Sequence, residues 1–95
     1  MKSIVIIYNA AIEDVVMEAL RGQVEKYTVF DRITGKGKNS VPHFGDNIWP
    51  ATNKLLMAVV EENIVKKVKD ALLPIKEDYK TEGLKLFVFP VEELI

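Results

Sequence analysis

The chain has 95 residues, of which 48% are hydrophobic, and its formal net charge is −1. This length and composition predict a single globular domain over residues 1–95. A charge so close to zero argues against nucleic acid as a partner, and the lack of cysteine excludes disulfides and thiolate metal sites. The first residues lack a signal-peptide pattern, and no apolar run reaches the roughly 18 residues of a membrane span. We therefore expect a cytoplasmic protein.

The first part of the chain predicts a strand, a helix and a second strand. Residues 3–8 are apolar and mostly β-branched, which is typical of a buried strand. Asn9 suits a helix N-cap. The apolar residues after it recur at the spacing of one helix face: Ile12, Val15, Val16, Ala19 and Leu20. Successive side chains of residues 26–34 then fall on two alternate faces, which predicts a second strand.

The second part repeats this order. Residues 54–60 predict a third strand, and residues 61–63 open a second helix with the apolar stripe Ile64, Val65, Val68 and Leu72. Pro74 is expected to end that helix or to lie just beyond it, with a polar connection over residues 75–83. Residues 84–89 predict the fourth strand. The order βαββαβ predicts an α+β, ferredoxin-like fold, in which both helices cover one face of a four-stranded antiparallel sheet.

The predicted strands are apolar on both faces, although two helices can cover only one. In the first strand Ile4 and Ile6 oppose Val5 and Ile7, and the third and fourth strands follow the same pattern. The second face would expose about six to eight apolar side chains, and burial of each is worth about 1.5–3 kcal/mol. We therefore expect further copies of the chain to cover this face, in a dimer or a trimer.

Residues 35–53 predict neither helix nor strand. Loops longer than about 12–15 residues are uncommon in compact domains and usually carry function. This segment contains the single Trp and the single His of the chain. We therefore expect it to hold the functional residues.

Its first residues, Gly35, Lys36, Gly37 and Lys38, suit an anion site, because flexible backbone N–H groups and two ammonium groups favour a phosphate or carboxylate. The alternative is a strand end with two solvated lysines.

Two further features of this segment have two interpretations each. His43 and Asp46 could bind a divalent metal, or His43 could be an ordinary hydrogen-bonding residue. Phe44 and Trp49 could present aromatic surface to a partner, or Trp49 could fix the segment to the protein body.

Residues 86–95, Leu-Phe-Val-Phe-Pro-Val-Glu-Glu-Leu-Ile, resemble the last strand of PII signalling proteins. The resemblance extends to the order of elements and covers most of the chain. It implies a homotrimer that is not an enzyme and that binds a small anionic effector, such as an adenine nucleotide, between subunits. It also implies that the long loop signals to a membrane transporter or a metabolic enzyme.

Within the resemblance, Thr28 and Lys85 match nucleotide-contacting positions, so they join the candidate ligand residues. The turn before the last strand keeps only Gly83, and the sequence given ends at Ile95, before the family's pair of arginines. Met57 stands where typical members have an acidic residue. The chain thus resembles a divergent, short-loop PII-like protein, and the alternative function is a metal-binding PII-like trimer that uses His43 and Asp46.

Overall fold

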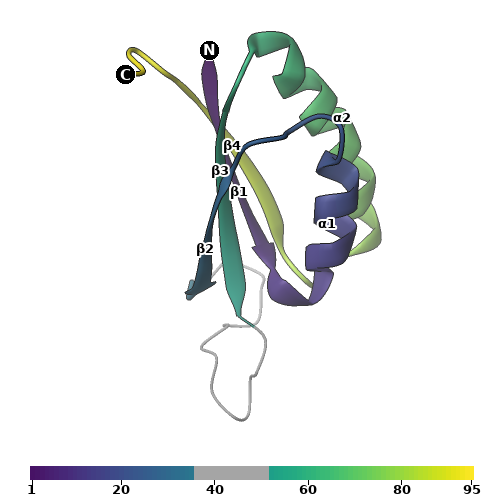
Figure 1. Cartoon of the computed structure of the whole chain (residues 1–95). Coiled ribbons are helices and arrows are strands. Elements are labelled where there is room, and N and C mark those ends of the chain that lie inside the picture. The colour runs from purple at the N-terminus through teal and green to yellow at the C-terminus, as the bar shows by residue number, and fades with distance from the viewer. Residues whose placement is uncertain (36–51) are drawn as a thin grey trace.

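The computed structural model describes residues 1–35 and 52–95. Two α-helices lie side by side against one face of a twisted sheet (Figure 1). The elements follow in the order β1 (Lys2–Asn9), the 3-10 helix η1 (Ala10–Ile12), α1 (Glu13–Leu20), β2 (Thr28–Ile33), β3 (Asn53–Val60), α2 (Glu62–Asp78) and β4 (Leu84–Pro90).

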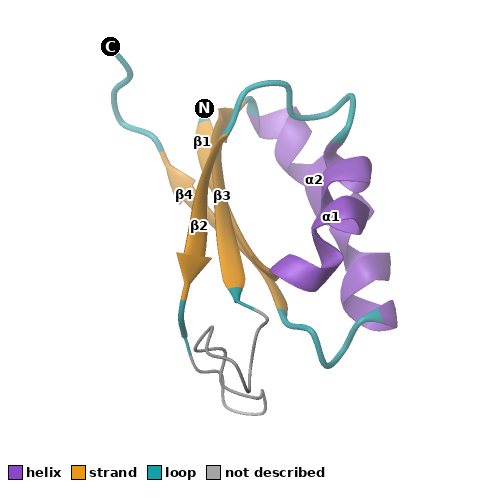
Figure 2. Ribbon diagram, turned by 60° about the horizontal axis from the view of Figure 1, so that its bottom comes forward, coloured by secondary structure: helices purple, strands orange, loops and turns teal. Residues whose placement is uncertain are grey.

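The sheet has the strand order β2-β3-β1-β4, and every neighbouring pair is antiparallel. The register places Val5 of β1 between Met57 of β3 and Phe87 of β4. β1 and β3 are therefore the central strands, while β2 and β4 form the two edges. The view in Figure 2 shows the same two layers, with both helices on one side of the strands. The predicted ferredoxin-like fold is confirmed.

The core lies between the sheet and the two helices. β1 contributes Ile4, Ile6 and Tyr8, and each of these side chains is fully buried. Opposite them lie the helix residues whose spacing predicted one apolar face: Ile12, Val16, Leu20, Val68 and Leu72. The remaining residues of both predicted stripes are partly buried against this core. The alternate residues of β1 and the regularly spaced apolar residues of the helices thus pack together in one apolar layer.

Asn9 starts the first helical segment, as predicted. Its backbone is extended, and its side-chain oxygen accepts a hydrogen bond of 2.8 Å from the backbone N–H of Ala11. A 3-10 turn precedes α1, and two acidic residues then occupy the first turn of α1. Gly22 has a φ of 81°, the left-handed conformation with which many helices end.

The prediction that Pro74 ends the second helix was wrong. α2 continues through Pro74 to Asp78, although proline offers no N–H to the carbonyl of Asp70. Ile75 is buried and Tyr79 packs against the core, so the last turn gains apolar contacts that offset the missing bond. Lys76 also donates a hydrogen bond of 2.7 Å to the backbone oxygen of Leu84, which ties the end of α2 to the start of β4.

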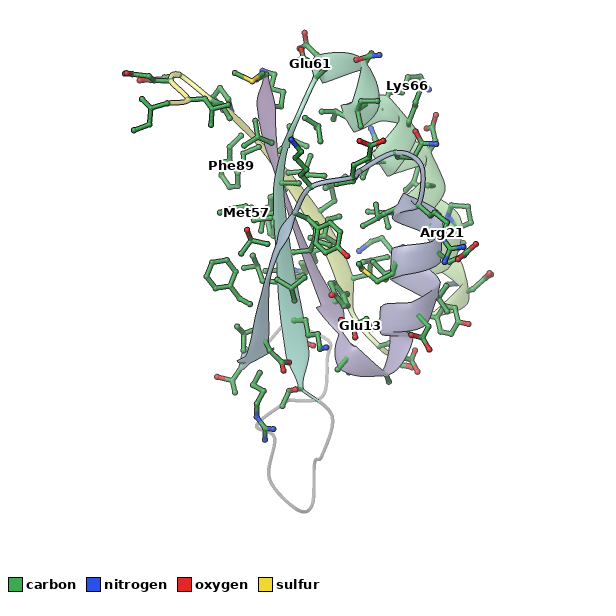
Figure 3. The ribbon with its side chains drawn as sticks, viewed as in Figure 1. Glu13, Arg21, Met57, Glu61, Lys66 and Phe89 are labelled. Carbon is green, nitrogen blue, oxygen red and sulfur yellow. The ribbon has the colours of Figure 1, made fainter. Side chains whose placement is uncertain are left out.

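The face of the sheet away from the helices is apolar and open, and we call it the open face. Among the described residues, no element covers it. Its apolar side chains are Val5, Ile7, Phe30, Leu55, Met57, Val59, Phe87 and Phe89. Figure 3 shows Met57 and Phe89 pointing away from the helices, and they are 40% and 50% exposed. The expectation of a second apolar face is therefore confirmed.

Candidate effector-binding site

Thr28 and Lys85, the two described residues at nucleotide-contacting positions of the resemblance, both belong to the open face. Cross-strand partners form two neighbouring rows across this face: Thr28, Met57, Val5 and Phe87, and then Phe30, Leu55, Ile7 and Lys85. Both Thr28 and Lys85 are exposed. Each therefore places a polar group at the rim of an apolar surface.

The structure does not bring Thr28 and Lys85 together within one chain. Thr28 lies on β2 and Lys85 on β4, which are the opposite edges of the sheet. Three strand spacings separate these edges, or about 14 Å. Thr28 and Lys85 of one chain therefore do not converge on one point.

Most of the predicted loop residues lie outside the described part of the chain. Gly35, the first of the predicted anion site, is exposed and follows β2 closely. The predictions outside the described residues concern Lys36, Gly37, Lys38, His43, Phe44, Asp46 and Trp49. Their proposed roles remain predictions.

A polar network lies where the predicted loop leaves and rejoins the sheet. The Tyr8 hydroxyl donates a hydrogen bond of 3.0 Å to one carboxylate oxygen of Glu13, and Lys54 Nζ donates one of 2.8 Å to the other. Lys54 Nζ also lies 3.9 Å from Asp31 Oδ1. Figure 3 shows Glu13 at the start of α1, beside the sheet. The network thus joins β1, α1, β2 and β3, and Asp31 and Lys54 flank the loop.

This network raises the pKa of two titratable groups. Burial raises the pKa of the Tyr8 hydroxyl, and the hydrogen bond to the Glu13 carboxylate raises it further. For Lys54, the hydrogen bond to Glu13 raises the pKa of the ammonium and outweighs the opposing effect of burial. The Glu13 carboxylate therefore favours the protonated form of both neighbours.

β2 contains an irregularity that sequence reasoning missed. Phe30 pairs with Leu55 and Ile33 with Asn53, so β2 holds one extra residue in this interval. Within the interval Arg32 has a φ of 55°, which is uncommon for a residue other than glycine. The Asp31 side chain accepts a hydrogen bond of 2.8 Å from the Arg32 backbone N–H. The distortion lies just before the loop, where it redirects the chain.

Over residues 1–35 and 52–95, no group of three or more His, Asp or Glu side chains is arranged to bind a metal. In the same residues no helix is both long and apolar enough to cross a membrane. The predicted metal pair, His43 and Asp46, lies outside this part of the chain.

Comparison with known proteins identifies the family. The profile of the family described as "Nitrogen regulatory protein P-II" matches residues 1–95, the entire chain. The chain belongs to the P-II family. P-II proteins are regulatory signalling proteins, and a trimer is their typical assembly. A search of the curated proteins finds no match.

Solved structures share the fold of this P-II chain. CPII from Thiomonas intermedia K12, bound to ADP and bicarbonate, superposes with a TM-score of 0.74 at 22% identity, over 92% of this chain and 81% of CPII. The apo form of CPII gives a TM-score of 0.66 at 19% identity, over 95% and 89% of the two chains. A PII-like signalling protein from Thermus thermophilus gives 0.63 at 18% identity, over 92% and 82%.

Gly83 is the single glycine that this P-II chain keeps in the turn before β4. Gly83 has a φ of 75°, a backbone conformation that residues with a side chain rarely adopt. The turn therefore favours glycine at this position, although the neighbouring positions hold other residues. The Gly83 carbonyl accepts a hydrogen bond of 3.3 Å from the backbone N–H of Asn9. The turn that presents Lys85 is therefore attached to the segment that starts the first helix.

Proposed function

We propose that this P-II chain is a homotrimeric regulatory protein, not an enzyme, and that it binds a small anionic effector in clefts between subunits. Thr28 from one subunit and Lys85 from the next line each cleft, together with the segment from Gly35 to Lys38. An adenine nucleotide is the proposed effector. Binding of the effector changes the conformation of the loop that contains Phe44 and Trp49. A membrane transporter or metabolic enzyme then recognises this loop.

The separation of Thr28 and Lys85 is the observation that carries this proposal. They lie on one face of the sheet but on opposite edge strands. In the closed ring that we propose, the β2 edge of one copy meets the β4 edge of the next. The two residues would then converge on one ligand between subunits.

The apolar open face supports a closed assembly. Half-exposed Phe30, Met57, Phe87 and Phe89 form a surface that is costly to leave in water. Packing three sheets around one axis buries this surface and leaves the helices outside.

The structures of CPII support the choice of ligand. One CPII complex contains ADP and bicarbonate, and another contains ADP, AMP and bicarbonate. Lys85 supplies a cation suited to a phosphate, and the hydroxyl of Thr28 supplies a hydrogen-bonding group.

A solution mass and a thermal-shift screen with ADP, AMP, ATP and bicarbonate test the proposal. We expect a trimer mass, and a ligand at 100 times its Kd should stabilise the folded protein by about 2.7 kcal/mol. A monomer at micromolar concentration, or an unchanged Tm with every compound, would contradict it.

A mixing experiment tests the intersubunit cleft itself. Thr28→Val and Lys85→Met should each abolish nucleotide binding, because every cleft loses one contact. Rings refolded from both variants should regain about one intact cleft each, since one copy supplies Thr28 and its neighbour Lys85. Lys67→Ala, on the exposed side of α2, is the control and should bind as wild type. Absence of any recovery after mixing would show that one copy supplies both residues.

The metal-binding alternative has no such support. It depends on His43 and Asp46 alone, and the described residues add no cluster of metal ligands. Calorimetry with zinc on the wild type and on His43→Ala tests it, and equal binding by both would exclude it.

A further inference from the structure

Arg32, in the distorted part of β2, has a backbone conformation that a glycine would adopt without strain. Its φ of 55° lies in the left-handed region, which residues with a side chain rarely occupy. The Asp31 side chain supports this conformation, because it accepts a hydrogen bond of 2.8 Å from the Arg32 backbone N–H. Residues held in such conformations cluster at binding sites and switch regions. The arginine at this position therefore needs an explanation beyond the turn itself.

The guanidinium of Arg32 is exposed and has no acidic partner in residues 1–35 and 52–95. The carboxylates nearby are directed to Lys54 instead, with Glu13 Oε1 at 2.8 Å and Asp31 Oδ1 at 3.9 Å from its Nζ. Because Lys54 reaches Glu13 on α1, this cluster lies on the helix side of the sheet. Arg32 therefore offers a cation with five N–H donors that the described residues leave available to a ligand.

Arg32 lies between Thr28 and Gly35 on the β2 edge that borders the proposed cleft. Thr28 is four residues before it, or about 13 Å along a strand. Cross-strand pairing places Lys85 in the row of Phe30, one row nearer to the loop than Thr28. In a ring whose axis runs along the strands, equivalent rows of all copies lie at the same level. Toward the loop, the cleft would then present Thr28, Lys85 of the next copy and Arg32 in that order.

This order matches the polar groups of a nucleoside diphosphate. The hydroxyl of Thr28 suits the nucleoside, and the ammonium of Lys85 suits the first phosphate. A guanidinium binds a terminal phosphate through two parallel N–H···O bonds, which suits Arg32 to the second phosphate. A nucleoside monophosphate ends at the first phosphate, so it would leave the Arg32 guanidinium without a contact.

We propose that Arg32 binds the second phosphate of a nucleoside diphosphate, so that the cleft selects a diphosphate over a monophosphate. Asp31 is a positioning residue in this arrangement, because its side chain holds the backbone from which the guanidinium extends. This inference rests on the proposed function and adds to it a residue that determines specificity.

Calorimetry with ADP and AMP on the wild type and on Arg32→Gln tests the proposal. We expect the wild type to bind ADP more tightly than AMP. Arg32→Gln should weaken ADP binding about tenfold or more, as for a lost hydrogen bond to a charged group, and should change AMP binding less than about twofold. Arg32→Lys should recover part of the preference, because lysine supplies the charge without the planar pair of donors. Arg21→Gln is the matched control, since the other arginine is paired with Glu18 at 3.1 Å, and it should leave both affinities unchanged.

Arg32→Gly separates the role of the side chain from that of the backbone. Glycine adopts the same φ without strain, so this variant should unfold near the wild-type temperature and still lose the preference for ADP. A preference for ADP that survives in Arg32→Gly or Arg32→Gln would overturn the inference. An equal loss of ADP and AMP binding, or a wild type that binds both equally, would overturn it too. Each of these results leaves the proposed nucleotide effector intact, whereas a wild type that binds neither nucleotide refutes both.

Discussion

Glu13 is the residue on which the network beside the loop depends. One carboxylate accepts hydrogen bonds from Tyr8 on a central strand and from Lys54 on the strand that leaves the loop. The Tyr8 side chain is fully buried, so its hydroxyl has no access to water as a substitute partner. No motif in the sequence points to this role for Glu13. Its partner Lys54 is 41 positions away, and no local pattern links two such residues.

Removal of the Glu13 charge tests this role. Glu13→Gln should lower the free energy of unfolding by about 1–3 kcal/mol, because the buried hydroxyl of Tyr8 loses its charged acceptor. Chemical denaturation measures the change. Asp14→Asn, the neighbouring exposed acid, is the matched control and should be nearly neutral. Equal effects of the two substitutions would contradict a specific role for Glu13.

The raised pKa of Tyr8 predicts a loss of stability in alkali. Above pH about 10 the unfolded chain releases the tyrosine proton, while the folded chain retains it. Protons then bind preferentially to the folded state, and its stability falls by up to about 1.4 kcal/mol per pH unit for one group. Lys54, whose pKa is also raised, adds a loss of the same sign. Unfolding curves between pH 8 and about 11 should fall less steeply for Tyr8→Phe than for the exposed control Tyr27→Phe.

At the scale of elements, apolar spacing predicted the strands, the helix stripes and the two-sided sheet. It succeeded because Ile4 and Ile6 face the helices while Val5 and Ile7 face away, which strand geometry alone determines. The prediction failed at Pro74, because the burial of Ile75 outweighs the tendency of proline to end a helix. The irregularity at Arg32 was also missed, because an extra residue in a strand depends on its pairing with β3 and leaves no clear trace in composition.

Substitution of Pro74 measures the cost of proline within α2. Pro74→Ala should raise the free energy of unfolding by about 1–3 kcal/mol, because alanine restores an N–H for the Asp70 carbonyl. Pro74 is exposed, so little packing is lost. Thermal or chemical unfolding provides the measurement, with Lys67→Ala as a control for helix propensity alone. A fall in stability would instead show that the proline ring positions Ile75 for burial.

At the scale of the whole molecule, the open face is an apolar surface that an isolated copy leaves in water. Phe87 lies on this face beside Phe89, with ring centroids 6.5 Å apart. It is 43% exposed in one copy, so a charge at this position is hydrated as long as the copy remains alone. In an assembly the same charge would be buried without a partner.

Phe87→Lys should therefore dissociate the assembly while leaving a folded monomer. Sedimentation or light scattering at micromolar concentration measures the mass, and circular dichroism verifies the fold. Lys67→Glu, which reverses a charge on α2, should retain the wild-type mass. An unchanged mass for Phe87→Lys would exclude the open face from the subunit interface.

The placement of Thr28 and Lys85 on opposite edges has a consequence for a cell that makes both a normal and an altered form of the chain. Each copy in a ring would complete the pocket on its left with one residue and the pocket on its right with the other. A copy altered at both residues would therefore damage both of the pockets that it borders. When normal and altered copies are present in equal amounts, only about one pocket in four would remain intact, whatever the number of copies in the ring.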